Sequence, residues 1–168
     1  MKLNHLLLLL TFVTPYSYAC NFHQSTGFSF ITEPGSLDVF ERVIEMRQSE
    51  QLVSYNSFDP LQTALYPSFT EMLHQPFEKK INFTIFEAII GHYSEINLNS
   101  PMIITDREQA ITESDLLLIT EWDVLDTLVT RTMSWQQVKQ LGLVKINGKA
   151  NEIIQLDEWF TVMFPEPQ

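Results

Sequence analysis

The longest apolar run of the chain lies near its start. Residues 6–13 follow a lysine and are all apolar except for one threonine. This run is too short to cross a bilayer, which takes about 20 helical residues, but it suits the apolar core of a secretion signal. Ser17 and Ala19 are small residues placed before Cys20 at the spacing of a cleavage site. We therefore expect residues 1–19 to be a signal peptide that is removed on export.

Residues 36–80 have the pattern of short helices. Ser36 is expected to cap a first helix, in which apolar residues recur at three- and four-residue intervals. Asp59 and Pro60 are typical of a second helix start, and Pro67 is expected to end that helix. The residues before this part, 20–35, mix aromatics with Gly, Ser and Pro and predict an extended arm.

Alternating and continuous apolar runs predict strands after residue 80. Residues 81–85 and 94–98 alternate between apolar and polar positions, and a short strand is expected at 102–104. The continuous apolar run 116–119 suits a central strand buried on both faces. Residues 85–90 fit either a strand or a helix, because Thr84 and Glu87 also have capping-box spacing; this choice stays open.

The last third of the chain has the clearest pattern. Apolar spacing predicts a helix over 122–129, a capped short helix from Ser134 to Gly142, a strand at 143–146 and an amphipathic helix over 150–164. The fold class that follows is α/β (α+β), with a small mixed sheet covered by helices and a helical N-terminal part. We expect residues 36–168 to form a single globular domain.

Two segments of this last third carry a family resemblance. LLLITEWDVLDTLV (116–129) and SWQQVKQLGLVKINGKANEIIQLDEWF (134–160), with Gly142 and Gly148 flanking a strand, resemble the C-terminal part of the sterol carrier (lipid-transfer) domain family. The resemblance implies an apolar pocket between a sheet and helices, and no conserved catalytic group. Lys149 stands where the family usually has an acidic residue.

The charge balance narrows the function. The chain has 21 acidic and 10 basic residues, a formal net charge of −11, so it repels phosphate backbones and is not expected to bind nucleic acid. No stretch after the leader is apolar over the roughly 18 residues that a membrane span requires. No metalloprotease or nucleophile-elbow motif occurs, so nothing in the sequence points to an enzyme, and no cofactor is predicted.

Cys20 and His23 leave three alternatives open. Cys20 would be the first residue after cleavage, where it could carry a lipid anchor, remain a free thiol, or make the chain a metal or thiol-redox factor that binds Cu(I) or Zn(II) together with His23. The chain contains one cysteine, so no internal disulfide is possible. The expected location is outside the cytoplasm, either periplasmic or lipid-anchored to the envelope.

We expect the chain to bind an apolar small molecule or lipid in a pocket of its C-terminal half. Seven apolar residues are the candidates for lining that pocket: Phe83, Phe86, Trp122, Leu125, Trp135, Leu143 and Phe160. The same side chains could instead form the core of the domain. A different class of function is also open, an envelope accessory protein that docks on a protein partner through its acidic surface or through the arm 20–35.

Overall fold

The computed structural model describes residues 32–52, 60–99, 103–107, 111–112 and 114–167. These residues form a five-stranded mixed sheet with the strand order β3-β2-β1-β4-β5. The strands are β1 Phe83–Glu87, β2 His92–Asn97, β3 Ile103–Asp106, β4 Leu117–Thr120 and β5 Lys145–Asn147. The central pair, β1 and β4, is parallel, whereas the β1–β2, β2–β3 and β4–β5 pairs are antiparallel.

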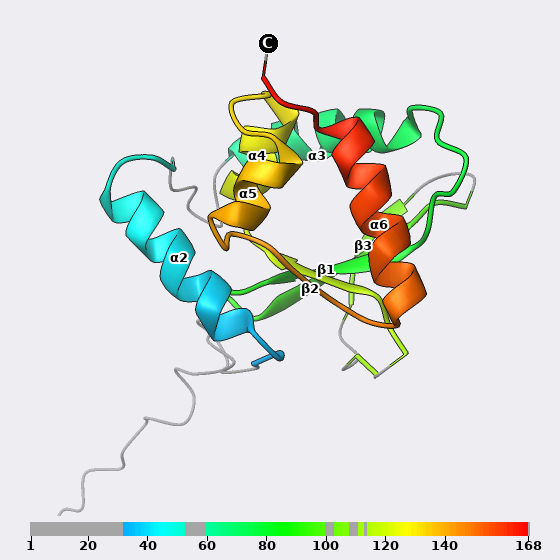
Figure 1. Cartoon of the computed structure of the whole chain (residues 1–168), viewed down its shortest axis with the longest axis horizontal. Helices are drawn as coiled ribbons and strands as arrows, with labels where there is room; N and C mark the ends of the chain where they lie inside the picture. The colour runs from blue at the N-terminus through cyan, green and yellow to red at the C-terminus, as the bar shows by residue number, and fades with distance from the viewer. Residues whose placement is uncertain (1–31, 53–59, 100–102, 108–110, 113, 168) are drawn as a thin grey trace, which may run out of the picture.

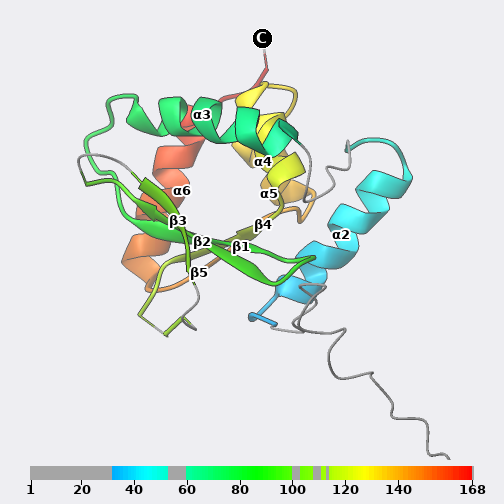
Figure 2. The same cartoon turned by 180° about the vertical axis from the view of Figure 1, so that it is seen from behind.

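The helices lie mostly on one side of this sheet. They are α2 Ser36–Gln48, α3 Pro60–His74, α4 Trp122–Val129, α5 Trp135–Gln140 and α6 Ala150–Met163. Figures 1 and 2 show α3, α4, α5 and α6 above the strands, while α2 stands apart at one end. The mixed sheet, its helical cover and the helical N-terminal part confirm the predicted fold class.

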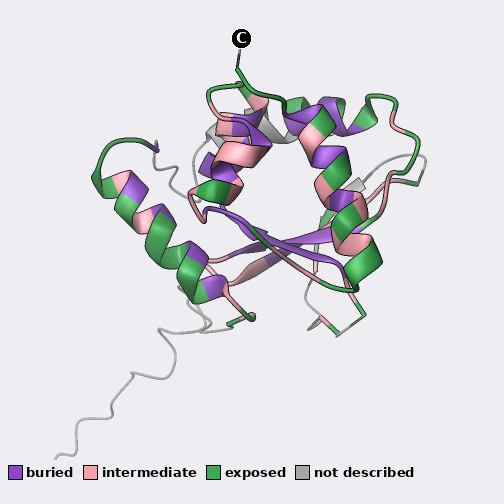
Figure 3. Cartoon of the chain, in the orientation of Figure 1, coloured by how far each residue is buried: buried purple, intermediate pink, exposed green. Residues whose placement is uncertain are grey.

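Both faces of the central strands are buried, as the purple strands of Figure 3 show. Successive strand residues point to opposite faces. Phe83 meets Trp159 and Phe160 of α6, with ring centroids 6.2 and 5.6 Å apart. Phe86, on the other face, packs 4.8 Å from the ring of Tyr93, whose hydroxyl donates to Glu33 just before α2. The continuous apolar run in β4 therefore follows from two-sided burial.

Several local predictions are confirmed in the C-terminal half. Leu117–Thr120 is a buried strand, and the helices at 122–129 and 150–163 form where the apolar spacing predicts them. Ser134 and Gln137 form a complete capping box at the start of α5. Gly142 has a positive φ of 72° just after that helix, a conformation that ends helices and favours glycine.

Two predictions at helix boundaries and one open choice are decided by the structure. Pro67 does not end the second helix, because α3 continues through it; its later turns bury Phe69, Met72 and Leu73, and such packing outweighs the local cost of proline. Ser36 does not cap α2; Gly35 is the N-cap residue, and the Ser36 hydroxyl instead accepts from the Glu33 amide. The segment 85–90 is strand followed by turn.

The buried face of α2 differs in part from the apolar side that the spacing of Leu37, Phe40, Val43 and Ile44 predicts. Val39, Val43 and Met46 point into the core, whereas Leu37 and Phe40 are 65% and 38% exposed. Because apolar residues occur on two sides of this helix, spacing alone does not identify the side that meets the sheet.

Candidate functional site

A pocket with a largely apolar lining lies between α5, β5 and α6. It has a volume of about 390 Å³ and is lined by Lys139, Val144, Lys145, Ile146, Ile153, Ile154 and Asp157. Figure 1 shows α5 and α6 beside one another, joined by the segment that contains β5. We call this the α5–β5–α6 pocket.

Strand and helix periodicity explain its apolar surface. Val144 and Ile146 are two residues apart on an extended segment, so their side chains point to the same face. Ile153 and Asp157 are four residues apart on α6 and therefore lie on one stripe of the helix. Ile154 lies next to that stripe and is 58% exposed. The pocket thus has branched aliphatic side chains at a solvent-accessible position.

Two glycines set the path of the chain around the pocket. Gly142, with its positive φ, separates α5 from the strand segment. Gly148 follows β5 with φ 148°, and a Cβ there would lie 3.0 Å from Leu116 Cδ1 and 3.3 Å from Leu116 Cα. A side chain at position 148 would therefore push β5 and α6 away from Leu116, which directly precedes β4.

A fixed polar group forms one wall of the pocket. Asp157 Oδ1 accepts from Lys139 Nζ at 2.6 Å and from Trp135 Nε1 at 2.6 Å. Lys139 Nζ also lies 5.9 Å from the centre of the Trp135 ring, which attracts the cation. The three side chains connect α5 to α6 and hold the two helices together at this point.

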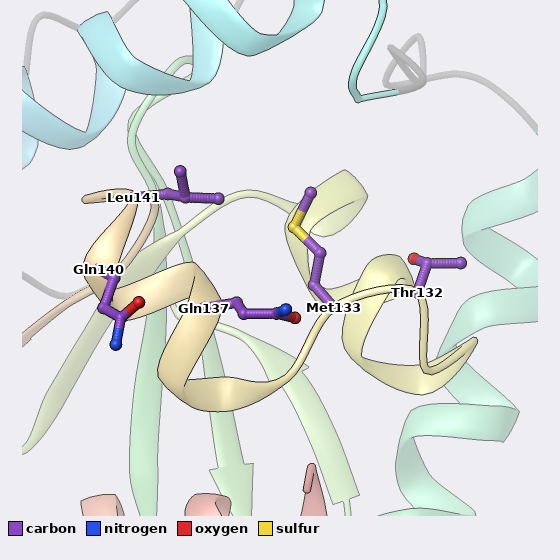
Figure 4. A pocket seen from close by; sticks show the side chains of 5 residues that line it. All are labelled: Thr132, Met133, Gln137, Gln140 and Leu141. Atoms are coloured by element: carbon purple, nitrogen blue, oxygen red, sulfur yellow. The ribbon is translucent and has the colours of Figure 1, made fainter. Parts of the chain in front are cut away.

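A second described pocket lies beside α5. It measures about 380 Å³ and is lined by Thr132, Met133, Gln137, Gln140 and Leu141. Figure 4 shows Gln137 directed toward Met133 and Gln140 directed away from both. The side-chain oxygen Oε1 of Gln137 accepts from the Ser134 amide, and the Thr132 hydroxyl donates to the Thr127 backbone carbonyl oxygen. Both side chains therefore already hydrogen-bond to the nearby backbone.

A cluster of buried charges lies where the parallel strands β1 and β4 end. Glu87, Glu121 and Asp123 are all buried. Arg47 of α2 donates to Asp123 Oδ2 at 2.6 Å and lies 3.6 Å from Glu121 Oε2, while His92 Nδ1 is 2.8 Å from Glu87 Oε1. Ligands of open α/β sheets often bind at such strand ends, but here the charged groups pair with one another.

Burial controls the protonation of Glu121. Desolvation raises the pKa of Glu121 to about 8, even though its carboxylate accepts a hydrogen bond from the Ile89 amide. The neighbouring charge of Glu87 contributes to this rise in pKa, and Arg47 opposes it. Glu121 is therefore mostly protonated at neutral pH, which relieves repulsion among the three carboxyl groups.

The structure places all seven predicted ligand-binding residues in the hydrophobic core. Each is at most 3% exposed: Phe83, Phe86, Trp122, Leu125, Trp135, Leu143 and Phe160. None of them lines either of the two pockets described above. Trp135 donates a hydrogen bond to Asp157, which lines the α5–β5–α6 pocket. The role of these residues in ligand binding stays a prediction.

The predicted metal or lipid-attachment residues, Cys20 and His23, lie outside the described residues. Within the part of the chain that the structure describes, no three His, Cys, Asp or Glu side chains are grouped to hold a metal ion. None of the helices in that part is long and apolar enough to cross a membrane.

Sequence reasoning missed the lining of the α5–β5–α6 pocket, although one signal was present. The apolar face expected for the last helix contains Ile153, Leu156 and Phe160. Ile154 and Val162 fall outside that face, and they are 58% and 67% exposed. A β-branched residue away from the buried stripe of an amphipathic helix marks an exposed apolar position, which becomes informative only where other apolar side chains lie beside it.

Comparison with known proteins gives remote structural similarity. No protein-family model matches the chain, and no curated protein matches it. Among solved structures, it is similar to sterol carrier protein 2-like 3 from Aedes aegypti (16% identity, TM-score 0.45, covering 60% of this chain and 97% of that one). It is also similar to sterol carrier protein 2-like 2 from Aedes aegypti (11% identity, TM-score 0.44, covering 57% of this chain and 93% of that one). A third similar structure is sterol carrier protein 2 from Yarrowia lipolytica (13% identity, TM-score 0.39, covering 68% of this chain and 100% of that one).

The names of these solved structures contain the name of the family that residues 116–129 and 134–160 resemble in sequence. All three TM-scores lie below 0.5, so no ligand, activity or site residue is transferred to this chain.

Proposed function

We propose that this chain is an exported, non-enzymatic protein that binds an apolar small molecule or lipid in the α5–β5–α6 pocket. The observation that carries the proposal is the lining of this pocket, in which four branched aliphatic residues meet at the surface: Val144, Ile146, Ile153 and Ile154. Its volume of about 390 Å³ falls within the range of small-molecule sites, roughly 300–1,000 Å³. A ligand that covers Ile154 would remove exposed apolar surface from water.

The polar groups of the pocket support binding rather than catalysis. The Lys139 ammonium group donates to Asp157 Oδ1 at 2.6 Å, and an ammonium group has no lone pair with which to act as a nucleophile. Asp157 in turn accepts from Trp135 and Lys139 on the same oxygen, so it is held in place as an acceptor. These contacts stabilise the wall of a binding pocket.

A matched pair of variants on α6 tests the proposal. Native mass spectrometry of protein purified from its own source would show the bound molecule, and a thermal-shift series over fatty acids, sterols and quinones would give its class. Ile154→Asn should lower the affinity for the bound class about tenfold or more, since it places an amide in the apolar lining. Val162→Asn is the control, because Val162 is exposed on the same helix but does not line the pocket.

Absence of any bound molecule, together with no stabilisation across the series, would contradict the proposal. Equal losses of affinity in Ile154→Asn and Val162→Asn would instead show that the binding site lies outside this pocket.

The export component of the proposal is supported by the leader-like pattern of residues 1–19. Mass spectrometry of the mature N-terminus tests it. A first residue at Cys20 with a free thiol indicates a periplasmic protein, and a diacylglyceryl adduct indicates an envelope anchor and rules out metal binding through Cys20 and His23. An intact polypeptide that still begins at Met1 would contradict export.

A second candidate function, docking on an exported protein partner, is favoured by the outer face of α2. Leu37 and Phe40 are exposed there, and Asp38 and Glu41 on the same helix add negative charge, whereas the charge of Glu45 is paired with Arg42. Apolar residues surrounded by acidic ones suit a partner with apolar and basic side chains. Pull-down from the envelope with Leu37→Asn and Phe40→Asn variants would separate this function from ligand binding, because neither residue lines the α5–β5–α6 pocket.

A further inference from the structure

We infer that the α5–β5–α6 pocket selects an uncharged apolar ligand that bears a hydroxyl group over ligands with an anionic or cationic head. This inference rests on the proposed function and specifies the ligand class of the same pocket. It follows from how the charged groups around the pocket are paired and directed.

The charges on the pocket wall neutralise one another. Lys139 Nζ and Asp157 Oδ1 are 2.6 Å apart, and about a third or less of each side chain is exposed. A charged head placed here would meet both members of the pair, so the attraction of one is offset by the repulsion of the other. Moving a charged head of either sign out of water has a desolvation cost that the wall, being already paired, does not offset.

Lys145 lines the pocket but its ammonium group is directed elsewhere. It lies between Val144 and Ile146, so strand alternation sends its side chain to the opposite face. Its methylene carbons pack against the backbone of Gly35 at the start of α2: a Cβ built on Gly35 would lie 2.9 Å from Lys145 Cδ and 3.3 Å from Lys145 Nζ. Lys145 is therefore not placed over the apolar lining to receive an anion.

Asp157 is not readily released to make room for an anion. Its Oδ1 accepts the indole N–H of Trp135, whose side chain is buried, as well as the ammonium group of Lys139. Displacing the carboxylate would leave a buried donor without its partner. An incoming anion therefore competes with a carboxylate that is held by two hydrogen bonds.

The same wall offers a place for a hydroxyl group. No described residue donates a hydrogen bond to Asp157 Oδ2, since both hydrogen bonds of this carboxylate involve Oδ1. A ligand hydroxyl can donate to Oδ2 while its carbon chain lies against Ile146, Ile153 and Ile154. Such a ligand adds no charge to the pocket and leaves the Lys139–Asp157 pair intact.

The experiment compares three ligands with the same ten-carbon chain. Decanol, decanoate and decylamine are titrated into the purified full-length mature protein at pH 7, below the concentrations at which they form micelles, and affinities are measured by calorimetry. We expect decanol to bind about tenfold more tightly than either charged ligand. Quenching of tryptophan fluorescence gives a second readout, because Trp135 contacts Asp157.

Asp157→Asn separates charge selection from general apolar binding. Asparagine can still accept from Trp135, but it leaves the Lys139 ammonium group unpaired, so decanoate should gain about tenfold in affinity and become preferred over decylamine. Glu158→Gln is the control: it makes the same change in net charge on an exposed residue of α6 outside the pocket lining, and it should leave the order of the three ligands unchanged.

Each result has a definite meaning. Equal binding of the three ligands, tightest binding of decanoate to the wild type, or the same shift in Asp157→Asn and Glu158→Gln would overturn the inference while the proposed apolar site stands. No binding of any of the three to a folded protein would overturn the proposed function itself, and the inference with it.

Discussion

Arg47 Nε donates a hydrogen bond to Asp123 Oδ2 at 2.6 Å, which joins α2 to the start of α4 across 76 positions of the sequence. The Asp123 side chain is fully buried, and the same guanidinium group lies 3.6 Å from Glu121. One arginine therefore contacts two buried carboxyl groups at the ends of the central strands. This relationship fixes the position of the helix that otherwise stands apart in Figure 1.

Removal of Arg47 should be strongly destabilising. Arg47→Met leaves Asp123 buried without a counter-charge, and loss of one partner from a buried pair lowers the free energy of unfolding by about 3–5 kcal/mol. Urea unfolding followed by circular dichroism measures the loss. Arg42→Met is the control, since its pair with Glu45 is exposed and should contribute less than about 1 kcal/mol. Similar losses in both variants would show that the buried cluster does not hold α2.

Stability should depend on pH through Glu121. Its pKa is raised from about 4.5 to about 8 by burial, so the folded state binds a proton that the unfolded state has lost over this range. The free energy of unfolding should therefore decrease as the pH rises from about 4.5 to about 8, by at most about 1.4 kcal/mol per pH unit from this group.

Glu121→Gln tests this pH dependence. Glutamine can keep the carbonyl contact with the Ile89 amide but cannot ionise. Urea midpoints measured at several pH values from 5 to 8.5 should fall with pH in the wild type and change less in the variant. Parallel curves for the two proteins would show that Glu121 is not the titrating group. His92, which pairs with Glu87, is present in both proteins and cancels in the comparison.

Truncation of a residue that was predicted to line the ligand pocket should lower the stability of the fold. Leu125 has no exposed surface, and Leu125→Ala should lower the free energy of unfolding by about 2–5 kcal/mol through lost burial and a residual cavity. Leu37→Ala, at an exposed position, should change it by less than about 0.5 kcal/mol. If Leu125→Ala left stability unchanged but weakened ligand binding, Leu125 would belong to a ligand cavity rather than to the packed core.

Gly148 should not tolerate a side chain. With φ at 148° and Leu116 Cα 3.3 Å from the position of an added Cβ, Gly148→Ala strains the backbone and displaces the neighbouring strand segment. We expect a loss of about 1–3 kcal/mol in the free energy of unfolding. Gly142→Ala is a useful comparison, because its φ is also positive but its nearest neighbour is a flexible Arg42 side chain at 3.4 Å, and it should lose about 1 kcal/mol. A larger loss for Gly142→Ala than for Gly148→Ala would contradict this account.

Local patterns in the sequence determined most of the C-terminal elements. The capping box of Ser134 and Gln137, the amphipathic helix after residue 150 and the buried strand near residue 117 depend on residues within one or two turns of each other. Hydrogen bonds and apolar stripes over such short separations are visible in the sequence. The resemblance to the sterol carrier family rests on this same part of the chain.

The tertiary structure decided what depends on residues far apart in the chain. Pro67 lies inside a helix because the turns after it are buried, and α2 turns Val43 rather than Leu37 toward the core. Three further features depend on how distant parts of the chain pack together. They are the strand order, the hydrogen bond between Arg47 and Asp123, and the presence of both Ile146 and Ile154 in the lining of one pocket. These long-range contacts cannot be predicted from residue spacing, because many long-range arrangements are compatible with the same local patterns and packing of the whole chain selects one of them.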